Sequence, residues 1–211
     1  LRAENVELVS RPGYLGVAYH VAGVMDFDVE IDVPGKFSVY NSLTAISVCR
    51  HFQVPVEMIK DALKKAKVKG RIEMIKVSDD FTLMIDYAHN AMSLESLLTT
   101  LKEYNPKRLV CLFGCGGNRS AGRRKGMGFV SGRLADMTVI TSDNPRFESP
   151  EAIMTDIETG VLEGGGEYVK ICSRLDAIRY ALEISDRDDI VLLAGKGHET
   201  YQDIEGRRTQ M

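Results

Sequence analysis

Four short segments of the sequence combine glycine with acidic, basic and amide residues, and they are the parts best suited to bind a charged small molecule. They are residues 86–89, 114–119, 142–146 and 195–199. Each follows a short aliphatic run that predicts a β-strand. Because ligands of open α/β sheets bind outside the carboxyl ends of the strands, we expect these segments to share one site.

The glycine-rich segment 114–119 predicts an anion site. Its glycines are expected to expose backbone amides near a helix start, and Arg119 adds a guanidinium that can hold an oxyanion through two hydrogen bonds. A dinucleotide-binding turn is an alternative, since Asp143 follows the next strand. That alternative is weaker because Arg119 occupies the place of the third glycine. A GxxxxGK[ST] phosphate loop is also absent from these 211 residues.

The turn at residues 142–146 predicts recognition of an amino acid. It offers a carboxylate, an amide and a guanidinium, with a proline that fixes the backbone, and this set suits a ligand carrying both ammonium and carboxylate groups. The alternative for its arginine is a surface ion pair with Glu148 or Glu151. The residues in question are Asp143, Asn144, Pro145 and Arg146.

The segment 195–199 adds a second carboxylate to the predicted site. Glu199 can pair with a further ammonium group, and Gly195 or Gly197 would let the backbone approach a ligand closely. His89 and His198 are interpreted as helix caps or turn residues. A metal site is not expected, because no Cys/His cluster accompanies them.

The elements that must position these segments follow a regular succession from residue 71 onward. Strands are predicted at residues 82–86, 108–113, 137–141, 167–171 and 190–194. Between them, helices are predicted around residues 94–101, 127–134, 150–161 and 175–182, the third one capped by Ser149. This succession predicts an α/β fold, a Rossmann-like, open, mostly parallel sheet with helices on both faces.

Residues 1–69 follow a different pattern. Alternating apolar residues between positions 6 and 31 predict two or three antiparallel strands, with a hairpin turn at residues 11–13. Helices are predicted at residues 39–52 and from Pro55, and the basic run before Gly70 is interpreted as a linker. Because these elements make a poor domain alone, we interpret them as the trailing part of a larger domain.

Composition narrows the function further. The chain has 211 residues, of which 44% are hydrophobic and 27% charged, and its net charge is -3. This balance is typical of a soluble globular protein and gives no reason to expect nucleic acid or a membrane as partner. Without an apolar span or a signal segment, we expect a cytoplasmic protein. Reduced core thiols are expected at Cys49, Cys111, Cys115 and Cys172.

Taken together, six segments of the chain resemble the Mur ligases, a family of ATP-dependent ligases of cell-wall synthesis. The similarity is greatest to the members that add the third residue to UDP-N-acetylmuramoyl-L-alanyl-D-glutamate. It implies three domains, for the uridine nucleotide, for ATP and for the incoming amino acid. Residues 1–69 would end the central ATP-binding domain, and residues 70–211 would form the amino-acid-binding domain. The segments are PGKFSVYNSLTA, GRIE, DYAH, FGCGGNR, TSDNPRFESP and AGKGHETYQ.

The resemblance also implies roles for single residues. The tetrapeptide DNPR marks family members that add meso-diaminopimelate, and Arg146 would bind the distal carboxylate of that amino acid. The implied diaminopimelate site is Arg119, Asp143, Asn144, Pro145, Arg146, Gly195 and Glu199. The implied nucleotide contacts are Asn41, Arg71, Asp86 and His89.

The family's remaining machinery is expected upstream of Leu1. This includes the phosphate loop and the modified lysine that holds Mg²⁺, so no catalytic residue is expected here, and the chain alone is expected to be inactive. Expected ligands of the whole enzyme, a monomer, are ATP, Mg²⁺, meso-diaminopimelate and the UDP-N-acetylmuramoyl-dipeptide. Two departures from the family are Ser38, in place of asparagine, and the loop at residues 90–92. The alternative is a stand-alone dinucleotide- or amino-acid-binding α/β protein without ligase activity.

Overall fold

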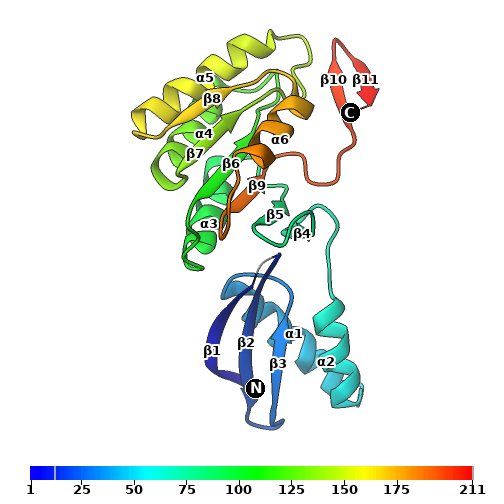
Figure 1. Cartoon of the computed structure of the whole chain (residues 1–211). Coiled ribbons are helices and arrows are strands. Elements are labelled where there is room, and N and C mark those ends of the chain that lie inside the picture. The colour runs from blue at the N-terminus through cyan, green and yellow to red at the C-terminus, as the bar shows by residue number, and fades with distance from the viewer. Residues whose placement is uncertain (12, 211) are drawn as a thin grey trace.

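The N-terminal region, residues 1–69, is a small antiparallel sheet with two helices (Figure 1). The computed structural model of the chain describes residues 1–11 and 13–210. The strands lie in the order β1-β2-β3 and are antiparallel, as predicted. The elements are β1 (Arg2–Arg11), β2 (Tyr14–Ala22), β3 (Phe27–Ile31), α1 (Phe37–His51) and α2 (Val56–Lys65).

Alternation of apolar residues explains this small sheet. Val17, Tyr19 and Val21 of β2 are buried against the two helices, which contribute Ile46 and Ile59. The predicted hairpin is present, since Arg11 pairs with Tyr14, although Pro12 at its turn lies outside the described residues. The first helix starts two residues earlier than predicted, at Phe37 instead of position 39.

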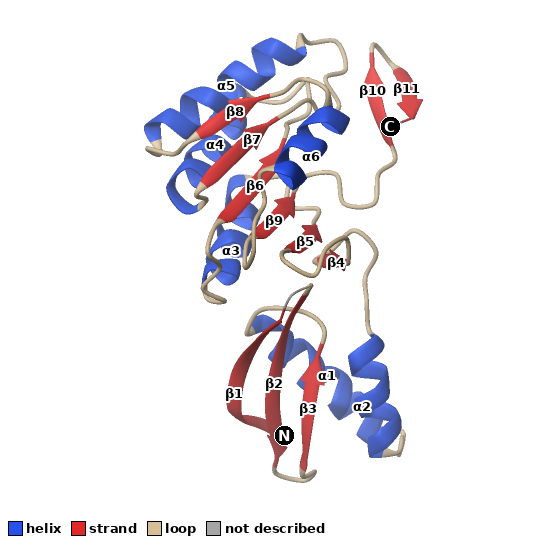
Figure 2. Cartoon of the chain, viewed as in Figure 1, coloured by secondary structure: helices blue, strands red, loops and turns tan. Residues whose placement is uncertain are grey.

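The C-terminal region contains a six-stranded sheet in the order β4-β5-β9-β6-β7-β8 (Figure 2). All neighbouring strands are parallel except β4 and β5. The five predicted strands are confirmed, each with ends within one residue of the prediction, whereas β4 was not predicted. The strands are β4 (Glu73–Ile75), β5 (Thr82–Ile85), β6 (Leu109–Phe113), β7 (Met137–Ile140), β8 (Tyr168–Lys170) and β9 (Ile190–Leu193).

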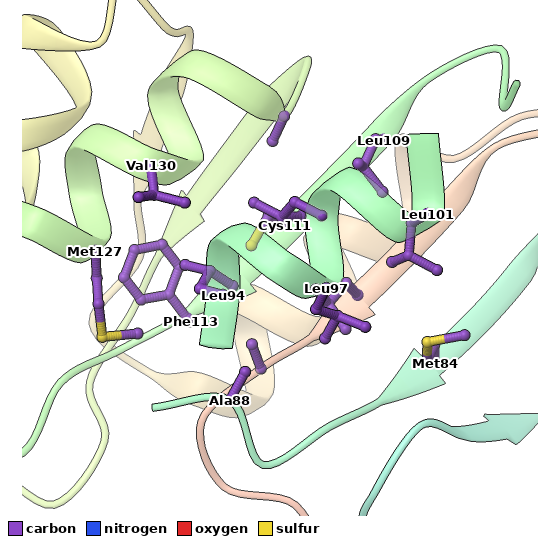
Figure 3. Packing of buried hydrophobic residues seen from close by; sticks show 14 of the residues in the cluster. Met84, Ala88, Leu94, Leu97, Leu101, Leu109, Cys111, Phe113, Met127 and Val130 are labelled. Atoms are coloured by element: carbon purple, nitrogen blue, oxygen red, sulfur yellow. The ribbon is translucent and has the colours of Figure 1, made fainter. Parts of the chain in front are cut away.

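Helices cover both faces of this sheet, as predicted. On one face, Leu94 of α3 and Met127 of α4 pack around Phe113 of β6 (Figure 3), and Ile157 of α5 belongs to the same cluster. On the other face, α6 packs Ala177 against β6 and β9. The helices are α3 (Ala91–Lys102), α4 (Ala121–Leu134), α5 (Pro150–Glu163) and α6 (Arg174–Glu183). Within residues 1–11 and 13–210, none of the helices has both the length and the apolar character of a membrane span.

A second antiparallel pair, β10 (Tyr201–Ile204) and β11 (Arg207–Gln210), forms a hairpin that the sequence did not predict. Figure 1 shows it in red beside the large sheet. Glu205 and Gly206 form its turn, and both have the positive φ angles, 50° and 76°, that suit a tight hairpin.

The four cysteines are free, but the expectation that all are core thiols is wrong. Cys111 and Cys115 are buried, Cys49 is half-buried, and Cys172 is exposed. The reason for the exposure is that Cys172 follows β8, the edge strand of the large sheet, where less of the structure covers the chain.

The two regions are joined by a buried tyrosine. The hydroxyl of Tyr104, just after α3, donates to the carbonyl of Gly16 at 2.9 Å and accepts from the amide of Gly35 at 2.9 Å. Next to it, Lys36 and Glu103 form an ion pair of 3.0 Å. These contacts link the start of α1 and strand β2 to the C-terminal region.

Candidate functional site

A cavity of about 220 Å³ lies at the carboxyl ends of β5, β6, β7 and β9, and all four predicted segments line it. The expected convergence of these strand ends is therefore confirmed. Of the seven residues predicted for an amino-acid site, only Pro145 does not line the cavity. The six that do are Arg119, Asp143, Asn144, Arg146, Gly195 and Glu199.

Arg146 is held in an unusual backbone conformation with its guanidinium fixed at two points. Its φ angle is 53°, in the left-handed region that favours glycine. Its Nη1 donates to the carbonyl of Gly117 at 2.6 Å, and its Nε lies 3.8 Å from Oδ2 of Asp203. Sequence reasoning missed Asp203, because nothing in a polar C-terminal stretch indicates a contact with a turn so far away along the chain.

The alternative that Arg146 pairs with Glu148 or Glu151 is wrong. Glu148 accepts two hydrogen bonds of 2.8 Å from Arg124, while Glu151 accepts one from Ser149. Arg124 is buried, and it also pairs with Asp156 at 2.9 Å. Arg124 lines the cavity and was missed, because the basic run at residues 123–125 gives no sign that its middle residue faces inward.

Glu199 stays ionised through three donors. Tyr87 donates to Oε1 at 2.7 Å, and Asn144 and Lys196 donate to Oε2 at 3.2 and 3.3 Å. Burial works to raise the pKa of Glu199, but these hydrogen bonds outweigh it, and the pKa is lowered. The carboxylate therefore faces the cavity with its negative charge, as recognition of an ammonium group requires.

Lys196 is a buried lysine whose ammonium group connects several residues around the cavity through hydrogen bonds. It is 3% exposed, and its ammonium donates to Oδ1 of Asn144 at 3.0 Å and to the carbonyl of Tyr201 at 2.6 Å. Asp143, also buried, lies 3.9 Å from both Lys196 and Arg174. Burial lowers the pKa of Arg174. The carboxylates of Asp143 and Glu199 thus have buried positively charged side chains next to them.

The glycine-rich turn serves mainly to let two turns pack backbone to backbone. A Cβ atom on Gly117 would lie 1.8 Å from the carbonyl oxygen of Pro145, and one on Gly114 would lie 2.3 Å from that of Thr141. The amide of Gly117 donates to the carbonyl of Asn144 at 2.8 Å. The expectation that the glycines expose free amides is therefore wrong for Gly117. Arg119 is exposed at the cavity, which leaves its guanidinium accessible to a ligand.

A second cavity, of about 450 Å³, brings together the four residues predicted to contact a nucleotide. Residues of both regions line it, and Tyr87 and His89 line this cavity as well as the first one. The predicted residues in its wall are Asn41, Arg71, Asp86 and His89.

Both oxygens of the Asp86 carboxylate are already engaged. Its Oδ1 accepts from the amide of Ala88 at 2.7 Å and its Oδ2 from that of Ile72 at 2.9 Å. Burial raises the pKa of this carboxyl. Asp86 therefore holds the backbone around the cavity in place.

The two departures from the family pattern have structural roles. Ser38 is buried and its hydroxyl donates to the carbonyl of Pro34 at 3.0 Å. In the loop at residues 90–92, Asn90 caps α3 by accepting from the amide of Ser93 at 2.9 Å. Across the described part of the chain, no group of three or more His, Cys, Asp or Glu residues is arranged to hold a metal ion.

Comparison with known proteins agrees with this arrangement. Residues 70–197 match the family described as Mur ligase, glutamate ligase domain. A UDP-N-acetylmuramoyl-L-alanyl-D-glutamate–2,6-diaminopimelate ligase of Caldanaerobacter subterraneus subsp. tengcongensis is 44% identical over 177 residues, which are 84% of this chain and 37% of the relative. For a ligase of the same name from Clostridium acetobutylicum, the identity is 40% over 205 residues, covering 96% of this chain and 42% of the relative. The chain thus spans about two fifths of the length of these relatives.

Solved structures extend the comparison to the fold. The structure of a UDP-N-acetylmuramoyl-L-alanyl-D-glutamate–2,6-diaminopimelate ligase superposes with a TM-score of 0.74 at 33% identity, covering 98% of this chain and 42% of that one. A folylpolyglutamate synthase from Thermotoga maritima shares the fold, with a TM-score of 0.67 at 20% identity over 90% of this chain and 43% of that one. With the family match covering more than half of its residues, the chain belongs to the Mur ligase family.

Proposed function

We propose that this chain is the part of a Mur ligase that binds meso-diaminopimelate and presents its amine for transfer to UDP-N-acetylmuramoyl-L-alanyl-D-glutamate. The observation that carries this proposal is the single cavity lined by Arg119, Arg146 and Glu199, in a chain 44% identical to a 2,6-diaminopimelate ligase. Residues 1–69 are proposed to be the end of the ATP-binding domain, and residues 70–211 the amino-acid-binding domain.

The charges of the cavity suit a guest with two ammonium and two carboxylate groups. Asp143 and Glu199 provide negative charge, while Arg119 and Arg146 provide guanidinium groups for carboxylates. We assign the distal carboxylate of meso-diaminopimelate to Arg146. Gly195, whose φ angle is 98°, leaves room beside Asp143 for the amino-acid backbone of the guest.

The second cavity is proposed to receive part of ATP. Asn41, Arg71 and His89 are the proposed contacts, and Asp86 contributes by shaping the wall. In the proposed reaction, ATP phosphorylates the glutamate side chain of the dipeptide. This gives an acyl phosphate and ADP. The amine of diaminopimelate then attacks the carbonyl carbon of the acyl phosphate, the carbon–oxygen bond to phosphate breaks, and the nitrogen loses a proton as the amide forms. The residues described here contribute positioning and charge stabilisation, which are large terms in such transfers.

The other parts of the reaction are assigned elsewhere. Residues 1–11 and 13–210 contain no group of three or more His, Cys, Asp or Glu side chains arranged to hold a metal ion. We therefore propose that the Mg²⁺ ligands lie in another part of the enzyme. We also propose that the enzyme acts as a monomer in the cytoplasm, where ATP is available.

Calorimetric titration of the 211-residue chain tests the proposed ligand class. Separate titrations use meso-diaminopimelate, L-lysine, ATP and NAD. We expect the tightest binding for meso-diaminopimelate and binding of lysine that is about ten- to a hundredfold weaker, because lysine leaves Arg146 without its carboxylate. A response to NAD alone would instead favour the dinucleotide-binding alternative.

Substitution of Arg146 tests the assigned contact. Arg146→Ala is expected to weaken meso-diaminopimelate binding about ten- to a hundredfold, which corresponds to roughly 1.5 to 3 kcal/mol for a lost hydrogen bond to a charged group. The matched control is Arg179→Ala on α6, which removes an exposed arginine outside the cavity and should leave the affinity unchanged. An Arg146→Ala protein with wild-type affinity would exclude the assigned role.

A further inference from the structure

The hairpin β10–β11 lies outside the part of the chain that matches the family model, yet it holds the turn that carries Arg146. The amide of Arg146 donates to the carbonyl of Asp203 at 2.9 Å, and the amide of Glu205 donates to the carbonyl of Arg146 at 2.8 Å. Ile204, between these two hairpin residues, forms a parallel bridge with Arg146. The backbone of Arg146 is thus bonded to the hairpin on both its amide and its carbonyl side.

The hairpin also contacts two other residues of the turn, Asp143 and Asn144. Gln202 donates from Nε2 to the carbonyl of Asp143 at 2.7 Å, and the amide of Asp203 donates to Oδ1 of Asn144 at 2.9 Å. The same Oδ1 accepts from Lys196, so the side chain of Asn144 is oriented from two sides. The hairpin therefore holds three residues of the 142–146 turn, namely Asp143, Asn144 and Arg146.

This support matters because the backbone of Arg146 would not adopt its conformation readily by itself. A φ angle of 53° is uncommon for a residue with a side chain, and here two hydrogen bonds to the hairpin hold it. The conformation sets the direction in which the arginine side chain leaves the turn. With Nη1 bonded to Gly117 and Nε facing Asp203, the guanidinium has a fixed orientation at the cavity wall.

The carboxylate of Asp203 depends on this arrangement in turn. Its Oδ1 atom is buried and has no hydrogen-bond partner within residues 1–11 and 13–210, and its Oδ2 atom lies 3.8 Å from Nε of Arg146. A buried carboxylate oxygen without a partner is costly, and the cation that lies within 4 Å of this carboxylate in the described structure is the guanidinium of Arg146. Asp203 and Arg146 are therefore a pair rather than two independent surface residues.

We propose that the β10–β11 hairpin sets the selectivity of the cavity, with Asp203 as a positioning residue that aims Arg146 at the distal carboxylate of the guest. This inference rests on the proposed function. Asp203 does not touch the guest; it restricts the guanidinium to the orientation that can bind a carboxylate through two hydrogen bonds. Its effect is therefore confined to guests that carry the distal carboxylate.

NMR titration of the ¹⁵N-labelled 211-residue chain tests this inference, because it follows weak binding and folding in the same spectra. The proteins are the wild type, Asp203→Asn and Asp203→Glu, each titrated with meso-diaminopimelate and L-lysine. For Asp203→Asn we expect the dissociation constant for meso-diaminopimelate to rise about three- to tenfold, with less than a twofold change for lysine. The Nε–H resonance of Arg146 should shift in the free protein, and Asp203→Glu should recover most of the affinity.

Glu205→Gln is the matched control, since it removes one negative charge from the exposed tip of the same hairpin and leaves the backbone bond to Arg146. It should bind like the wild type. If Asp203→Asn keeps wild-type affinity for meso-diaminopimelate, or loses affinity for both ligands equally, the inference is overturned while the proposed function stands. If the wild type does not bind meso-diaminopimelate, the proposed function fails and the inference fails with it.

Discussion

The two regions of the chain differ in how completely they bury their apolar residues. In the C-terminal region, every residue of β6 and β9 is buried between helices. In the N-terminal region, one sheet face is covered, but nine large apolar side chains are exposed, among them Tyr40 at 73% and Phe52 at 72%. The rest of the described chain, which is about twice as long, exposes seven. The larger region therefore has the rigid scaffold that a binding site needs, whereas the smaller one supplies a wall of the second cavity and has less core to stabilise it.

Cavity-creating substitutions in the two cores should separate the regions most clearly. Leu98 and Ile46 are both 0% exposed, one in each core. Each change to alanine should cost about 2 to 5 kcal/mol in the free energy of unfolding of its own region. Urea unfolding followed by circular dichroism, with meso-diaminopimelate binding measured in parallel, checks this. Ile46→Ala should keep the first cavity functional; loss of binding in that variant would mean that the regions fold as one unit.

The hydroxyl of Tyr104 is expected to have the next largest effect. Tyr104→Phe leaves the amide of Gly35 and the carbonyl of Gly16 without their partner, which should cost about 1 to 3 kcal/mol. The loss should appear mainly as earlier unfolding of the N-terminal region in a urea titration. Tyr40→Phe, which removes a hydroxyl from an exposed ring, is the control and should change nothing. Equal stability of both variants would show that the hydrogen bonds of Tyr104 do not couple the two regions.

A smaller, pH-dependent effect should occur in the N-terminal region alone. The hydrogen bond of His20 to Asp28 raises the pKa of the imidazole above its usual value of 6.5. A raised folded-state pKa stabilises the fold below the unfolded-state value, and this contribution is lost as pH rises through the folded-state pKa. The N-terminal region should therefore melt slightly lower at pH 8 than at pH 6. His20→Gln should remove this difference in melting temperature between pH 6 and pH 8. If the difference persists in the variant, another titrating group causes it.

The sequence predicted the scaffold well where local pattern and burial agree. Each of the five predicted strands of the large sheet ended within one residue of its prediction. The clearest case is residues 109–113, an aliphatic run in which every residue is buried. The start at Ser149 was also correct, since its side chain accepts from the amide of Ala152. Convergence of the four segments followed from the parallel arrangement of strands, which places their carboxyl ends along one edge.

What the sequence could not predict depends on contacts between distant residues. Strand β4 is only three residues long, and β11 is exposed throughout, so neither gives an apolar pattern. The burial of Lys196 and Arg124 is not visible in a local pattern, because both stand beside other polar residues and become buried only in the fold. The role of Gly117 as a close contact for Pro145 likewise requires the two turns to be in place.

Tyr87 and His89 line both cavities, so ligands bound in the two cavities would contact the same two side chains. The hydroxyl of Tyr87 already donates to the carboxylate of Glu199. A ligand in one cavity that orders these two side chains would change the affinity of the other cavity for its own ligand. Thermodynamic linkage requires this influence to be reciprocal, so that each guest changes the affinity for its neighbour by one common factor.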